Sequence, residues 1–323
     1  MQTTTAPKKA LSAGVPNDRA TLVIDLGNGQ VKALVKSADS NDFQQIQFPS
    51  YVAETQQSNS DCIRVLAGKE LKTYLVGEQA ADIPMSHTGK DESGKVDNAN
   101  LLVLHALRLA FGDSKHIHAD VVYTTPSNKA YGAAVAEKLE GVHPVTTPHD
   151  AEVITSEAIS QTITIHKAVA QLEGHYAFKT LNLKRDSWLI DVGNRTIIST
   201  LVTPAGRILK RRYFSGVGVR GLAERITTNE SLSFLMKEHT PERVIDALFS
   251  ADGAKAADVI AADISFCLAN VLNFIDDDAP RLLIGGGAQV PGLSKALSAK
   301  VAKKPQWANI TALSTVAPQI LEA

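Results

Sequence analysis

The segment at residues 21–35, TLVIDLGNGQVKALV, limits the fold more than any other part of the sequence. Its apolar run at 22–24 is short enough for one buried strand. The pair Asn28-Gly29 follows, and Asn-Gly after a strand is the strongest short signal for a hairpin turn, because both residues accept positive φ. Apolar residues then resume. The segment therefore predicts a β-hairpin with Asp25 at the end of its first strand.

The tip of this hairpin carries groups that suit a phosphorylated ligand. Lys32 can add a positive charge, and the carboxylate of Asp25 suits magnesium or its bound waters. An alternative interpretation makes Asp25 the cap of its own Asx-turn and Lys32 an exposed strand lysine. The backbone N–H groups that could face a phosphate chain belong to four consecutive residues: Gly27, Asn28, Gly29 and Gln30.

A second copy of this pattern stands 166 positions later, at residues 188–202, WLIDVGNRTIISTLV. Its Asp-x-Gly-Asn motif consists of Asp191, Gly193 and Asn194, and Arg195 follows directly. Two similar hairpins at the beginning of two similar halves indicate a ligand-binding function far more specifically than either hairpin alone. The repetition predicts two α/β domains that face each other across a cleft.

Further glycine-rich turns accompany the second copy. An apolar strand at 281–284 leads into Gly285, Gly286 and Gly287, which would let the backbone pass close to a ligand or would serve a strand-to-helix turn. Gly216 and Gly218 either border a ligand or begin a helix.

Together, the motifs DLGNGQVK, DVGN and LLIGGGA resemble those of the actin and sugar-kinase superfamily, and most of all the bacterial actin-like ATPases of the ParM type, which segregate plasmids. FPS at 48–50, LVGEQA at 75–80 and TTPS at 124–127 fit the same group. The resemblance runs from about residue 20 to the end of the chain. It implies an actin-like α/β fold, in which duplicated ribonuclease-H-like βββαβα domains face a nucleotide cleft and each carries a small insertion.

The expected division of the chain follows from this resemblance. It consists of a disordered tail at 1–19, domain I at 20–155 with an insertion at about 37–97, domain II at 156–312 with an insertion at about 222–256, and a C-terminal helix at 313–323 that packs back on domain I. Strands are expected at 44–51, 63–67, 73–76, 119–124, 207–214, 281–284 and 310–312. Helices are expected at 98–111, 128–139, 152–170, 219–227, 257–274, from Pro291 and at 316–322.

The resemblance also implies the roles of the site residues. The ligand would be magnesium-ATP, with GTP as an alternative; Asp25 and Asp191 would hold the metal through water, Lys32 would bind phosphate, and the triple-glycine turn would pass the adenosine. Glu157 matches the family's glutamate at the start of the helix that joins the halves, where it orients the attacking water beside Asp191. Glu152 is its rival, and a first-turn Glu could instead serve the helix dipole.

The chain departs from the family at several positions. Ser156 stands where the family commonly has Pro, Ile198 where many relatives have an acidic residue, and Arg195 where small residues are usual. The last two could change phosphate affinity or turnover. A small-molecule kinase, a nucleotide sensor and a cell-shape or positioning filament therefore remain alternatives to a plasmid-segregating ATPase.

Composition narrows the partners. With 33 basic and 34 acidic residues, the chain lacks the basic excess of a dedicated nucleic-acid binder. The resemblance implies head-to-tail self-assembly and a DNA-binding adaptor of the ParR type instead. No apolar run in the sequence is long enough to span a membrane, and we expect that the N-terminal residues do not form a signal peptide. The two distant cysteines, Cys62 and Cys267, could form a single disulfide, but reduced thiols in a cytoplasmic protein are the favoured interpretation. The basic run 210–212 is expected to be a solvated strand edge, with a contact to a neighbouring filament subunit or to a DNA adaptor as the alternative.

Overall fold

The computed structural model describes residues 19–57, 62–67, 69–81, 83, 92–126, 132–147, 159–230, 237, 240–275 and 278–323. These residues form two compact units. Unit 1 extends to Leu172 and includes Ser314–Ala323, and unit 2 is Glu173–Leu313. We expected domain I to end at residue 155, whereas the compact units divide after Leu172. The expected tail at 1–19 lies outside the described residues except for Arg19.

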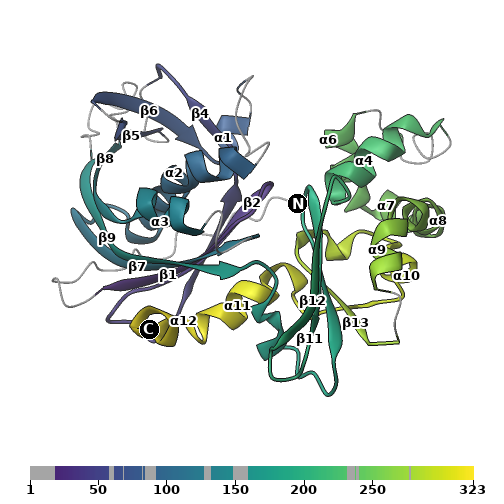
Figure 1. Ribbon diagram of the computed structural model, residues 1–323. Helices are drawn as coiled ribbons and strands as arrows, with labels where there is room; N and C mark the ends of the chain where they lie inside the picture. Colours follow the sequence, from purple (N-terminus) through teal and green to yellow (C-terminus); the bar gives the residue numbers. More distant parts are fainter. Residues whose placement is uncertain are drawn as a thin grey trace. The chain divides into compact units, whose positions relative to one another are not determined.

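Unit 1 is built on one large mixed sheet, with the strand order β3-β2-β1-β7-β9-β8-β5-β6-β4 in the described part of the chain. Figure 1 shows α2 and α3 against one face of this sheet and α12 against the other. The strands are β1 (Ala20–Leu26), β2 (Gln30–Lys36), β3 (Gln44–Pro49), β4 (Val52–Glu54), β5 (Cys62–Ala67), β6 (Glu70–Val76), β7 (His116–Thr125), β8 (Gly141–Thr147) and β9 (Ile159–Leu172). The helices are α1 (Glu78–Ala81), α2 (Glu92–Phe111), α3 (Ala133–Leu139) and α12 (Ala317–Glu322).

Helix α2 fills the centre of the unit 1 core. Ala99, Leu102, Ala106 and Ala110 recur at helical spacing, and all are buried against β1, β2 and β3. This apolar stripe confirms the helix predicted at 98–111. The strands of unit 1 alternate more weakly, because both faces of the central strand β1 are covered.

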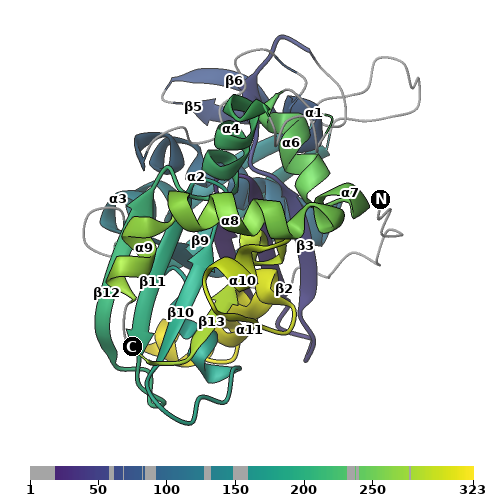
Figure 2. The same ribbon diagram turned by 90° about the vertical axis from the view of Figure 1, so that its right-hand side faces the viewer.

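Unit 2 contains a smaller sheet with the order β12-β11-β10-β13-β14. Trp188 and Ile190 face the core that includes α4, α6 and α8, while Leu189 faces the core that includes η2 and α11. Figure 2 shows α8 and α9 crossing one face of this sheet. The strands are β10 (Ser187–Val192), β11 (Thr196–Val202), β12 (Ile208–Ser215), β13 (Arg281–Ile284) and β14 (Lys300–Val301). The helices are η2 (Tyr176–Lys179), α4 (Val219–Thr228), α6 (Pro241–Leu248), α7 (Ala251–Lys255), α8 (Ala257–Cys267), α9 (Ala269–Phe274), η3 (Gly286–Gln289), α10 (Leu293–Ala296), η4 (Pro305–Trp307) and α11 (Ala308–Ser314).

The two units repeat one arrangement. β3-β2-β1-β7 in unit 1 corresponds to β12-β11-β10-β13 in unit 2, with the last strand parallel to the first strand of each hairpin. Asp25 pairs with Lys32 across its hairpin, and Asp191 pairs with Ile198 in the same register. The duplicated α/β architecture expected from the sequence is thereby confirmed.

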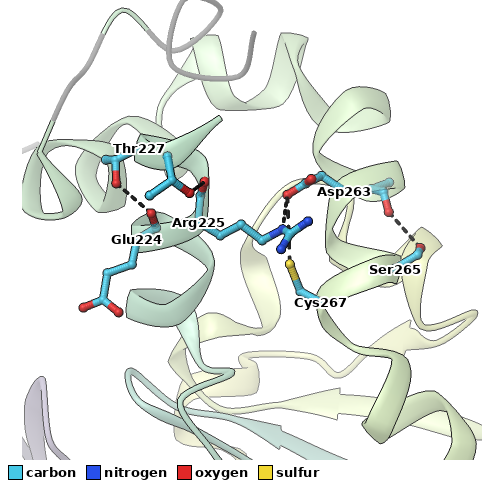
Figure 3. A network of polar contacts seen from close by, with 8 residues as sticks. Glu224, Arg225, Thr227, Asp263, Ser265 and Cys267 are labelled. Atoms are coloured by element: carbon cyan, nitrogen blue, oxygen red, sulfur yellow. Dashed lines mark hydrogen bonds and ion pairs between the residues drawn. The ribbon is translucent and has the colours of Figure 1, made fainter. Parts of the chain in front are cut away.

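Helix α4 connects the second hairpin to the helical layer of unit 2. Its Arg225 donates from Nε to Asp263 Oδ2 of α8 at 3.1 Å, and the Cys267 Sγ lies 4.0 Å from the same oxygen (Figure 3). The Arg225 guanidinium also lies 4.8 Å from the ring centroid of Phe266. These contacts tie α4, the helix that follows β12, to α8.

The helix predicted at 152–170 is wrong over its described part, because residues Ile159–Leu172 form strand β9. The segment ISQTITIHKAVAQL is rich in β-branched residues, and Gln161, Ile163 and Ile165 are buried while their neighbours are less so. This period of two favours a strand between β7 and β8. Strand β8 itself was not predicted.

Three predictions in the C-terminal part also need correction. Residues 310–312 belong to helix α11 and do not form a strand, since Ile310 and Leu313 are buried at helical spacing. The helix expected from Pro291 begins at Leu293, after Gly292 in the left-handed conformation. The single helix expected at 257–274 is divided at Leu268 into α8 and α9. The strand at 281–284 and the helices at 219–227 and 316–322 are confirmed within a residue or so.

Both cysteines are described, and they form no disulfide. Among the described residues, no helix has the length and apolar character needed to cross a membrane.

Acidification should destabilise unit 1 through His105, which is buried in α2 with its ring edge-on to Phe48 at 4.8 Å between centroids. Burial and the nearby Arg108 lower the pKa of His105 to about 3. Below about pH 6.5 the unfolded state therefore binds a proton that the folded state does not bind. The free energy of unfolding falls as the pH drops below that value. We expect His105→Leu to remove about 2 kcal/mol of the stability difference between pH 7 and pH 5.

Urea unfolding at the two pH values measures this difference. His116→Gln, on an exposed strand end, is the matched control and should keep the wild-type pH dependence. An unchanged pH dependence in His105→Leu would show that another group governs acid unfolding.

Candidate functional site

The first hairpin turn is fixed by contacts that leave little room for other residues. A Cβ on Gly27 would lie 2.6 Å from the carbonyl oxygen of Gln30, so only glycine fits there. Ser50, which follows β3, donates from its hydroxyl to the Gly27 carbonyl and from its N–H to the Gly29 carbonyl. The FPS motif thus supports the turn from outside the hairpin.

Asp25 lies at the carboxyl end of β1, where the sheet presents its polar groups. Thr124 of β7 donates from Oγ1 to Asp25 Oδ1 at 2.7 Å, and Lys32 Nζ lies 4.0 Å from Asp25 Oδ2. Lys32 is 8% exposed, which excludes the interpretation as an exposed strand lysine. The structure therefore joins the predicted carboxylate to the predicted lysine and adds Thr124.

A third strand extends this row. Thr124 pairs with Asp25 on one side and with Gln171 of β9 on the other. Residues that pair in neighbouring strands point to the same face, and two strand spacings separate Asp25 from Gln171 by roughly 10 Å. All three stand near the carboxyl ends of parallel strands, the edge at which α/β sheets bind ligands. Sequence reasoning missed Gln171 because it assigned residues 152–170 to a helix; the alternation in 161–165 could have revealed the strand.

The second hairpin turn is held by the start of α4. Val219 N–H donates to the Gly193 carbonyl and Arg220 N–H to the Asn194 carbonyl, at 3.1 and 2.7 Å. A Cβ on Gly218 would lie 2.5 Å from the Thr196 nitrogen, so glycine is required where the residues before α4 contact the second hairpin turn. Gly216 adopts a φ of +75°, and its N–H donates to the Arg195 carbonyl. The predicted Gly216 and Gly218 thus lie directly beside the second turn.

The carboxylate of Asp191 lies between two backbone segments of unit 2. A Cβ on Gly285 would stand 2.2 Å from Asp191 Oδ1, and one on Gly174 would stand 2.8 Å from Asp191 Oδ2. Both glycines have positive φ, +85° and +72°. This cradle brings the predicted Asp191 and Gly285 together and adds Gly174, which the sequence did not single out.

The remaining glycines of the triple turn differ from one another. A Cβ on Gly287 would lie within 2.6 Å of side-chain atoms of Val219 and Val192, so its role is close packing. A Cβ on Gly286 would meet nothing within 4 Å. Of the three, Gly286 alone is left open on its outer side, where a ligand could approach the backbone.

These turns are the features by which the chain can be compared with known proteins. Residues 23–174, which include the first hairpin, Thr124 and Gln171, match the family model described as the actin-like protein N-terminal domain. This confirms the resemblance that the sequence motifs indicated. A comparison with curated proteins finds no match.

Solved structures of actin-like proteins share the fold of the whole chain. They include the archaeal actin homologue Ta0583 (16% identity, TM-score 0.70, 93% of this chain and 99% of that one). They also include a 15-stranded ParM filament from Clostridium botulinum (17%, 0.64, 94% and 99%) and Bacillus thuringiensis ParM with ATP (14%, 0.63, 94% and 99%). At these identities the likeness establishes the actin-like fold.

Within this actin-like chain, the two hairpins are not chemically equivalent. Ile198 occupies the register position that Lys32 has in the first hairpin, and Ile198 is buried. The second turn has Arg195 instead, whose Nε is buried without a hydrogen-bond partner in the described part of the chain. In the first turn, Asn28 Oδ1 is likewise buried without a hydrogen-bond partner among the described residues. Both turns therefore retain polar groups that a bound ligand could satisfy.

Glu157 and Glu152, the two glutamates predicted to orient the attacking water, lie outside the described residues. Among the residues that are described, no group of three or more His, Cys, Asp or Glu converges on a metal position. Asp25 and Asp191 each have the carboxylate oxygens that suit magnesium or its waters.

Substitutions in the triple-glycine turn should separate packing from binding. We expect Gly285→Ala to lower the free energy of unfolding by more than about 1 kcal/mol, because the new Cβ collides with Asp191 and the backbone has positive φ. Gly286→Ala should leave the melting temperature within a few degrees of wild type and should weaken nucleotide binding several-fold. Thermal melting and titration with a fluorescent ATP analogue measure the two effects. Equal losses of stability in Gly285→Ala and Gly286→Ala would contradict the assignment of Gly285 to packing and Gly286 to binding.

Proposed function

We propose that this protein is an actin-like ATPase that polymerises on binding magnesium-ATP and disassembles after hydrolysis. The observation that carries the proposal is the repeated hairpin, which ends in an aspartate at the same register position of both units. Each aspartate stands at the carboxyl end of its strand, beside a glycine turn, where phosphates and metal-bound water are commonly held.

The proposed roles follow the geometry of each turn. The N–H groups of Gly27–Gln30 and of Asn194 and Arg195 bind the phosphates, and Lys32 adds positive charge. The Gly193 N–H donates to the Thr196 carbonyl, so Gly193 shapes the turn. Asp25 and Asp191 hold magnesium through its waters, and Asp191 helps to place the attacking water. Magnesium would neutralise charge that develops on the phosphates during hydrolysis. The open side of Gly286 leaves space for the adenosine to lie against the backbone. The same assays with GTP in place of ATP test which nucleotide is used.

Hydrolysis also needs a group that orients water toward the terminal phosphate. We propose Gln171 for this role, because it shares a register row with Asp25 and Thr124. Glu157, the residue expected from the sequence for this role, lies outside the described residues, and the variants described below compare it with Gln171.

The assembly and its cargo are proposed from relatives. A ParM from Clostridium botulinum forms a filament, and head-to-tail contacts generate open filaments because the two surfaces in contact differ. We extend this to self-assembly here, with a ParR-type adaptor linking filaments to plasmid DNA in the bacterial cytoplasm. The near-balanced charge of the chain supports contact with DNA through an adaptor.

Light scattering and pelleting with magnesium-ATP, with phosphate release followed in the same sample, test the proposal. Scattering should rise on ATP addition and decay as phosphate appears. Asp191→Asn should weaken both signals at least tenfold, because the amide removes the charge that attracts the hydrated metal. Protein that binds ATP but stays monomeric at high concentration would remove the filament claim, and phosphate release stimulated by a sugar would indicate a kinase.

A second pair of variants identifies the water-orienting residue. Gln171→Leu should slow phosphate release by about a hundredfold while polymerisation on ATP persists. Glu157→Ala should hydrolyse ATP like wild type. The reverse result would return the role to Glu157, and Gln161→Leu, a change on the same strand far from the row, controls for damage to β9.

A further inference from the structure

Arg211 differs from its neighbours in the basic run of β12. Lys210 is exposed, and the Arg212 guanidinium lies over the rings of Phe214 and Phe274 at 5.3 and 5.7 Å. Arg211 is partly buried and donates from Nη1 to Thr200 Oγ1 and from Nη2 to the carbonyl oxygen of Glu173, both at 2.8 Å. The run expected to be a solvated edge thus contains one arginine that makes two directed contacts inside unit 2.

The carbonyl that Arg211 binds belongs to the first residue of unit 2. Glu173 follows β9 directly, and Gly174 then lies against the carboxylate of Asp191 with a φ of +72°. The rest of this connector is also fixed, because Tyr176 N–H donates to Asn309 Oδ1 at 3.0 Å. Arg211 therefore holds the backbone of residues 173–174 at the place where it touches Asp191.

The electrostatics agree with this geometry. Burial lowers the pKa of Arg211, while the carboxylates of Glu173 and Asp191 raise it. An arginine remains charged under these conditions, and its planar fork can bind a hydroxyl and a carbonyl at once. A lysine has the same charge but lacks the fork, so it cannot reproduce both bonds in the same geometry.

We propose that Arg211 is a positioning residue for the ATPase reaction, which fixes the connector after β9 against Asp191. Gln171 precedes Glu173 by only two residues, so the same anchor restrains the end of the strand that carries the proposed water-orienting side chain. The Arg211 guanidinium thus acts on Asp191 through the backbone of Glu173 and Gly174. This inference rests on the proposed function and deepens it.

The test uses the full-length chain with Arg211→Met and Arg211→Lys, and Lys210→Met as the matched control on the same strand. Hydrogen exchange of the amides at 174–176 is measured without nucleotide. Magnesium-ATP affinity and the rate of phosphate release at saturating ATP are then measured for each variant. The exchange measurement reports the anchor whether or not the protein hydrolyses ATP.

We expect Arg211→Met to accelerate exchange at 174–176 and to slow phosphate release by about ten- to a hundredfold, with ATP affinity within about threefold of wild type. Arg211→Lys should lie between Arg211→Met and wild type, and Lys210→Met should match wild type. A merely structural role would lower affinity and rate together with the melting temperature, which would overturn the proposal.

The remaining outcomes are equally decisive. Unchanged exchange in Arg211→Met, or an unchanged rate at saturating ATP, would overturn the inference even if the wild type hydrolyses ATP. If Arg211→Met does not fold, a folded Arg211→Lys with wild-type rate would overturn it, and a slowed rate at wild-type affinity would support it. Wild-type protein that neither binds nor hydrolyses ATP would overturn the proposed function, whereas the exchange result would still report whether Arg211 anchors the connector.

Discussion

The close approach of backbone to the Asp191 carboxylate is the constraint on which much of unit 2 depends. Gly174 and Gly285 flank this side chain, and any Cβ at either position would collide with it. The strand β10, the connector from β9 and the turn after β13 must therefore meet at one point. Because a carboxylate held by fixed backbone has little freedom to reorient, the fold alone sets the orientation of Asp191.

The two hairpins place their aspartates alike but surround them differently. In unit 1, Asp25 has Thr124 and Lys32 as polar partners, while in unit 2 the corresponding register positions hold Ile284 and Ile198. Positive charge therefore enters the two hairpins differently, from the strand residue Lys32 in the first and from the turn residue Arg195 in the second. The duplicated fold keeps the aspartates at one register position while the groups around them differ.

Local chemistry explains which features could be predicted from the sequence. The hairpins and the strand at 281–284 are encoded by short motifs, in which glycine turns and apolar runs leave few alternatives. Strand β9 was mistaken for a helix because its apolar residues satisfy both periods over a few positions, and pairing with β7 and β8 decides between them. Gln171 could not be found without that pairing, since its neighbour Thr124 lies 47 positions earlier in the chain.

The same argument explains why the sequence alone predicts a solvated strand edge at Arg211. A strand places alternate side chains on opposite faces, but a sequence does not say which face of an edge strand is covered. Here the face of β12 that carries Arg211 is covered by the connector at Glu173, a segment 38 positions earlier. A residue whose partners are a distant main-chain carbonyl and a hydroxyl on the next strand leaves no local pattern. Such contacts, which depend on tertiary structure alone, are where the chemistry of a shared fold can be adjusted without changing its motifs.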